Sequence, residues 1–85
     1  MKPRKLLAKL AQGNSQNVAF SDLRRLVEAL GFALVRISGS HHVYSHPGIT
    51  ELVNLQEVQG QAKPYQIGQL LRLVERYNLT LEDGP

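Results

Sequence analysis

The sequence contains no cysteine and no tryptophan, and none of its apolar runs approaches the length of a membrane span. Without cysteine, disulfides, thiolate nucleophiles and cysteine-ligated zinc sites are excluded. Without about 20 consecutive apolar residues there is no transmembrane helix. The basic start of the chain resembles the first part of a signal peptide, but Lys9 interrupts the apolar run that would have to follow. We therefore expect a soluble cytoplasmic protein without membrane association.

Acidic residues are missing from the first 21 positions, and this absence explains the net charge of +3. Four basic residues lie in the first ten positions, whereas the chain from Asp22 onward holds six basic and seven acidic residues. Positive charge attracts phosphate groups, so a nucleic-acid partner is one interpretation of the basic arm. A solvated basic tail is the other interpretation, and composition does not distinguish the two.

The spacing of apolar residues predicts one small domain preceded by an arm. Residues 3–12 form a short amphipathic helix that ends at Gly13, and the polar stretch 13–17 reads as a linker. We therefore divide the chain into a basic arm with its linker at 1–19 and a domain at 20–85, whose last four residues are expected to be frayed. A length of 85 residues allows a single modest core.

The sequence of the domain predicts an α+β fold. A helix is expected from Ser21, a plausible N-cap, to Leu30, because leucine and valine recur at helical spacing before Gly31. A second helix is expected to begin at Pro64. Between them lie three predicted strands of an antiparallel sheet, at 32–37, 41–45 and 50–55, followed by a loop at 56–63. Both helices would cover one face of this sheet and leave the other face open, as in double-stranded-RNA-binding domains.

The concentrated chemistry of the chain lies at 39–46, which holds all three histidines. A zinc site is disfavoured, because His42 and His46 would lie about 13 Å apart along an extended strand. Ser40 next to His41 does not make a nucleophile–base pair, since adjacent strand residues point to opposite faces. No metal and no cofactor are therefore expected.

General acid–base catalysis by one histidine remains. An ordinary imidazole titrates near pH 6.5, so both of its protonation states are populated near neutral pH. RNA suits such a catalyst, because its own 2′-hydroxyl is the nucleophile once a base removes the proton. Half-exposed strand histidines without a function are the alternative interpretation.

A family resemblance adds to this interpretation. Leu30-Gly31-Phe32, Val35-Arg36, the run from Gly39 to Tyr44, and His46-Pro47-Gly48 resemble the signature of HicA-type toxins from bacterial toxin–antitoxin pairs. The likeness runs from about residue 20 to residue 77. It is that of a divergent branch, because the stretch 54–66 has one lysine and no histidine where many family members have a histidine and several lysines.

The resemblance implies a toxin that is a metal-independent endoribonuclease acting on mRNA, with a HicB-type antitoxin as its protein partner. The family's catalytic histidine follows Gly-Ser, which is His41 here. We expect Arg36, Ser40, His42 and Lys63 to bind RNA.

We also expect the side chains of the second strand to divide between its two faces. Strand alternation separates His41 and Val43 from His42, Tyr44 and His46, and the latter three are candidates to line the open face and stack on bases. Tyr65 and Tyr77 are expected to pack beside the last helix. Two alternatives stay open: an RNA-binding module that does not cleave, and a protein-binding domain whose arm helix docks a partner.

Overall fold

The chain folds as three helices and one antiparallel sheet in a computed structural model that describes residues 1–82. The helices are α1 (Pro3–Ala11), α2 (Phe20–Ala29) and α3 (Pro64–Arg76). The strands are β1 (Ala33–Ser38), β2 (His41–His46), β3 (Ile49–Val58) and β4 (Gln61–Ala62), which lie side by side in chain order. The expected α+β fold is confirmed. Within the described range, no helix is long and apolar enough to span a membrane.

The sheet differs from the prediction at its end. The polar segment expected to be a loop instead extends β3 to Val58 and forms the two-residue strand β4, so the sheet has four strands. Gln59 and Gly60, both with positive φ, make the tight turn between them. The backbone of this segment pairs although its sequence lacks the apolar alternation typical of a half-buried strand.

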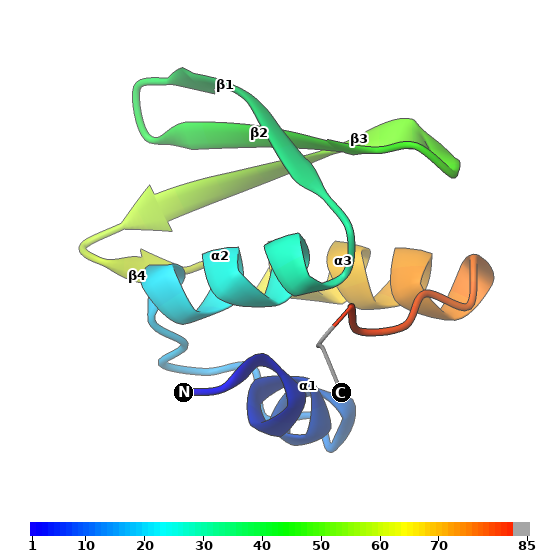
Figure 1. Cartoon of the computed structure of the whole chain (residues 1–85). Coiled ribbons are helices and arrows are strands. Elements are labelled where there is room, and N and C mark those ends of the chain that lie inside the picture. Colours follow the sequence, from blue (N-terminus) through cyan, green and yellow to red (C-terminus); the bar gives the residue numbers. More distant parts are fainter. Residues whose placement is uncertain (83–85) are drawn as a thin grey trace.

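The elements form three layers (Figure 1). The sheet is covered on one face by α2 and α3, and α1 lies on the far side of these two helices. Leu6 and Leu10 of α1 are 1% and 2% exposed and belong to the same buried cluster as the leucines of α2 and α3. The basic arm is therefore packed onto the body, which the sequence did not predict. The N-cap of α2 lies two residues earlier than expected, at Ala19 instead of Ser21, and no side chain caps the helix.

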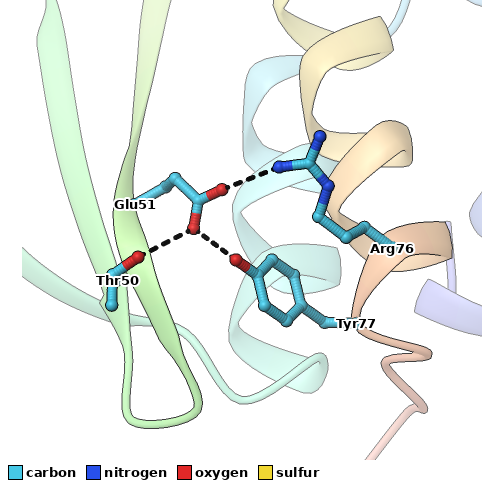
Figure 2. A network of polar contacts seen from close by, with 4 residues as sticks. All are labelled: Thr50, Glu51, Arg76 and Tyr77. Atoms are coloured by element: carbon cyan, nitrogen blue, oxygen red, sulfur yellow. Dashed lines mark hydrogen bonds and ion pairs between the residues drawn. The ribbon is translucent and has the colours of Figure 1, made fainter.

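A polar network fixes the end of α3 to the start of β3 (Figure 2). Tyr77 donates its hydroxyl to Glu51 Oε1 at 2.7 Å, and Arg76 Nη1 lies 3.2 Å from Glu51 Oε2. Thr50 donates to the same carboxylate at 3.2 Å. The hydroxyl of Tyr77 is the main cause that holds the pKa of Glu51 below its ordinary value.

Candidate functional site

The pairing of β2 with β3 decides which residues face the helices. Residues paired directly across antiparallel strands share a face. Tyr44 pairs with Val53 and His42 with Leu55, and all four side chains are buried, so this set faces α2 and α3. The expectation that His42, Tyr44 and His46 line the open face is therefore wrong.

Instead of facing solvent, His42, Tyr44 and His46 pack against other residues of the protein. The His42 ring lies against Phe20 with 4.8 Å between ring centroids, and the His46 ring lies against Phe32 at 5.1 Å. Tyr44 is fully buried, and its hydroxyl accepts a hydrogen bond from Nε of Arg24 at 3.1 Å. The bulky ring of Tyr44, rather than the smaller Val43, fills the core because the hydroxyl finds a partner at its rim.

His41 lies on the opposite, open face of the sheet. It is the first residue of β2, half-buried, and pairs with Ser38 of β1 and Gln56 of β3. Val43 shares this face, since it is buried yet lies outside the cluster packed between sheet and helices. Gly39, with φ +60°, provides the turn that leads into His41.

The ring of His41 is oriented by a side chain that the sequence did not indicate. Its Nδ1 lies 3.1 Å from Oδ1 of Asn54, which pairs with Val43 and so belongs to the open face. An amide oxygen only accepts, so the ring donates from Nδ1. In the neutral ring, Nε2 then carries the free lone pair and is the atom able to take a proton.

The expected cations lie on both sides of His41. Arg36 pairs with Val43, which makes it the diagonal neighbour of His41 at about 7–8 Å between Cα atoms. Lys63 directly follows β4 with an extended backbone, and because Ala62 pairs with Glu57, Lys63 lies level with Gln56. His41, Gln56 and Lys63 thus form a row across the sheet.

Ser40, in the turn before His41, is hydrogen-bonded to β3 at Gln56 and Glu57. The carbonyl of Ser40 accepts from the backbone N–H of Glu57 at 3.0 Å, and its hydroxyl accepts from Nε2 of Gln56 at 3.3 Å. Of the sequence-predicted site residues, the structure places Arg36 and His41 on the open face, with Ser40 in the turn that joins their strands and Lys63 directly after β4. His42 is separated from them, beneath the sheet.

One pattern in the sequence could have placed Asn54 beside His41. Asn54 alternates with Val53 and Leu55, so a core-facing assignment of those two already places Asn54 on the open face. Among residues 1–82, no group of three or more metal-ligating side chains gathers closely enough to hold a metal ion.

Comparison with known families gives one match. Residues 20–75 fit the family model described as the HicA toxin of bacterial toxin–antitoxin systems. The chain belongs to the HicA toxin family. The match covers α2, the whole sheet and nearly all of α3, and it begins after α1, so α1 is an addition to the common HicA domain. Searches of curated proteins and of solved structures returned no match.

Family membership makes the protein a toxin of a toxin–antitoxin system, and such a toxin implies an antitoxin partner. The open sheet face carries His41, the residue that the HicA resemblance singles out. On this face, Nε2 of His41 is free to accept a proton, and the cations Arg36 and Lys63 lie on either side of the histidine. The row of His41, Gln56 and Lys63 contains no carboxylate. Such a surface suits a polyanion that supplies its own nucleophile.

Proposed function

We propose that this HicA protein is a metal-independent endoribonuclease that cleaves mRNA with His41 as its general base. The hydrogen bond between His41 Nδ1 and Asn54 Oδ1, at 3.1 Å, is the observation that carries the proposal. It leaves Nε2 of an outward-facing imidazole as the proton acceptor. A HicB-type antitoxin is the proposed inhibitor, and the cytoplasm is the proposed location.

The chemical step uses the substrate's own hydroxyl. Nε2 of His41 takes the proton of a 2′-hydroxyl, the 2′-oxygen attacks the adjacent phosphorus, and the bond from phosphorus to the 5′-oxygen breaks. The leaving oxygen takes a proton from water. The products are a 2′,3′-cyclic phosphate and a 5′-hydroxyl, and no metal or cofactor enters the balance. One proton transfer of this kind contributes about 10²–10⁴-fold to the rate.

The neighbouring residues have binding roles in this proposal. Arg36 and Lys63 hold phosphates on either side of the scissile bond, and the hydroxyl and backbone of Ser40 shape the turn that presents His41. Two cations are a small electrostatic footprint, so the affinity for RNA should fall only modestly as the salt concentration rises. His42, with its ring against Phe20, is given a packing role rather than RNA contact.

The test replaces His41 by alanine and follows both cleavage and binding. We expect H41A to lose RNA cleavage and growth arrest on expression while it retains RNA affinity. Ser45→Ala, at the other end of the same strand, is the matched control and should cleave like the parent. Cleavage should persist in chelator and should leave cyclic phosphate ends by mass spectrometry.

The alternative is an RNA-binding module of the same fold that does not cleave. If H41A cleaves as fast as the parent, His41 is not the base. If the parent protein binds RNA and never cleaves it, the alternative holds.

A further inference from the structure

One aromatic ring of this protein lies in solvent. Phe20, Phe32 and Tyr44 are buried and Tyr77 is half-buried, whereas Tyr65 is 60% exposed. Tyr65 does not pack beside α3 as the sequence led us to expect. This exposure leaves the aromatic face of Tyr65 available to a ligand that offers a flat face of its own.

The ring lies at the level of His41. The register places Lys63 opposite Gln56, and Gln56 opposite His41. Two strand spacings separate Lys63 from His41, which is about 10 Å. Tyr65 follows two residues later, in the first turn of α3. It therefore stands at the edge of the open face, on the side away from Arg36.

The position of Tyr65 is fixed by a buried neighbour. Gln66 is 6% exposed, and its Oε1 accepts the backbone N–H of Gln56 at 2.7 Å. This bond attaches the first turn of α3 to the strand that pairs with β2 at His41. The backbone that carries Tyr65 is thereby attached to the strand that pairs with His41.

A cation accompanies the ring. Nζ of Lys63 lies 6.0 Å from the centroid of the Tyr65 ring, at the outer limit of a cation–π contact. The large exposure of the side chain leaves ring surface open beside this ammonium. An aromatic face next to a positive charge matches the two parts of a single-stranded nucleotide, a base and a phosphate.

We propose that Tyr65 and Lys63 form a base-stacking subsite that holds the unpaired nucleotide next to the scissile phosphate. The base stacks on the Tyr65 ring, and the Lys63 ammonium contacts the phosphate. Sheet-based RNA-binding domains stack bases on exposed aromatics in the same way. The inference rests on the proposed ribonuclease function and adds the requirement for a single-stranded substrate at this position.

The experiment measures binding, so it does not depend on cleavage. A short single-stranded RNA with 2′-O-methyl groups throughout, which lacks the nucleophile, is titrated with the full chain and followed by fluorescence anisotropy. One stacked base contributes about 1–3 kcal/mol. We therefore expect Y65A to weaken binding by roughly 5- to 150-fold, since 1.4 kcal/mol is a factor of ten.

Two control variants separate stacking from folding. Y65F keeps the aromatic face and should bind within about twofold of the parent, because the phenol oxygen is not part of the stack. Gln69→Ala, one turn further along α3 and exposed, should not change the affinity. Thermal unfolding of each variant checks that the fold is retained.

An abasic scan locates the stacked nucleotide. Removing the base at one oligonucleotide position should weaken binding to the parent, and the same removal should have no effect in Y65A. An equal abasic penalty in both proteins overturns the subsite. Unchanged RNA affinity of Y65A also overturns it and leaves the ring to a protein partner.

The failure of the subsite is distinguishable from failure of the proposed function. If the parent cleaves RNA through His41 and Y65A binds and cleaves equally well, only the subsite is wrong. If the parent neither binds nor cleaves RNA, both proposals are overturned.

Discussion

In the proposed mechanism, Asn54 orients the half-buried ring of His41 so that it can act as a base. Its oxygen holds the proton of the His41 ring on Nδ1. In N54A we expect RNA cleavage to fall by about 10- to 100-fold, the loss typical when the partner that orients a histidine is removed. Single-turnover cleavage measures the effect, and unchanged RNA affinity is the control. A cleavage rate equal to that of the parent would show that the hydrogen bond has no catalytic consequence.

Asn54→Asp gives a result that a purely structural role would not produce. The carboxylate accepts the same hydrogen bond and adds a negative charge that favours the imidazolium. Since the base must be neutral to act, the rise of cleavage rate with pH should shift to higher pH in N54D. Rates from pH 5 to pH 9 test this, and superimposable profiles for N54D and the parent would contradict it.

At the residue scale, the sequence predicted which side chains of β2 share a face with His41 but not which of the two faces is buried. Alternation along β2 defines two sets of side chains, and either set can be the buried one. Val43 suggested the wrong choice, because it is apolar and yet lies on the open face. Tyr44 occupies the core instead, since Arg24 of α2 donates a hydrogen bond to its hydroxyl. A contact 20 residues away in sequence is not visible in a local pattern.

At the scale of elements, Gly31 and Gly39 both have positive φ but differ in the space that a Cβ would find there. Gly31, with φ +99°, joins α2 to β1, and a Cβ there would lie 2.8 Å from Nε2 of His46. The His46 ring does not yield easily, because its Nδ1 accepts the N–H of Gly48 and its face meets Phe32. At Gly39, where φ is +60°, an added Cβ would meet no other part of the protein within 4 Å.

Alanine at these two positions should therefore cost different amounts. We expect G39A to lower the free energy of unfolding by about 1–2 kcal/mol, the cost of left-handed backbone for an L-residue. G31A should lose about 2–5 kcal/mol, because overpacking against the His46 ring adds to that cost. Urea unfolding of both variants measures the difference. Equal losses would show that the His46 ring moves aside freely.

The network of Figure 2 predicts how acid affects the attachment of α3. The pKa of Glu51 is lowered in the folded protein, mainly by the hydroxyl of Tyr77. A carboxylate with a depressed pKa stabilises the fold above its unfolded-state pKa and loses this contribution as the pH falls through the folded-state pKa. We expect E51Q to be less stable than the parent at pH 7, with the difference shrinking below about pH 4.5. Denaturant unfolding at several pH values checks this, and a difference independent of pH would contradict it.

The elements themselves were largely predictable, and the exceptions have physical reasons. Helical spacing of leucines and the prolines at helix starts predicted all three helices to within a few residues. The end of β3 and all of β4 were missed because strands can form through backbone pairing alone, at the edge of a sheet, without apolar alternation. Ser21 was a reasonable N-cap by residue type, yet the helix begins beside it at Phe20.

At the scale of the whole molecule, α1 is part of the core although it lies outside the HicA match. Replacing Leu10 by alanine removes a fully packed side chain and should lower the free energy of unfolding by about 2–5 kcal/mol. Lys5→Ala, on the exposed side of the same helix, should change it by less than about 0.5 kcal/mol. Chemical denaturation measures both, and a negligible loss in L10A would mean that the arm contributes nothing to stability.

The docking of α1 was beyond the sequence for a simple reason. An amphipathic stripe shows that a helix buries one face, but it does not show whether its partner is the same chain or another protein. The stripe of α1 meets α2, so the partner of this helix is the chain itself.

The other end of the molecule shows the opposite situation. Every residue of β1 is exposed, and its substantial contacts are with β2 (Figure 1). Its amides should therefore exchange with deuterated water sooner than those of β2 and β3, which lie over the helices. Arg36 lies on this edge strand, so its position should adjust to a phosphate bound in the proposed way, whereas His41 lies on β2, which is paired with a strand on each side.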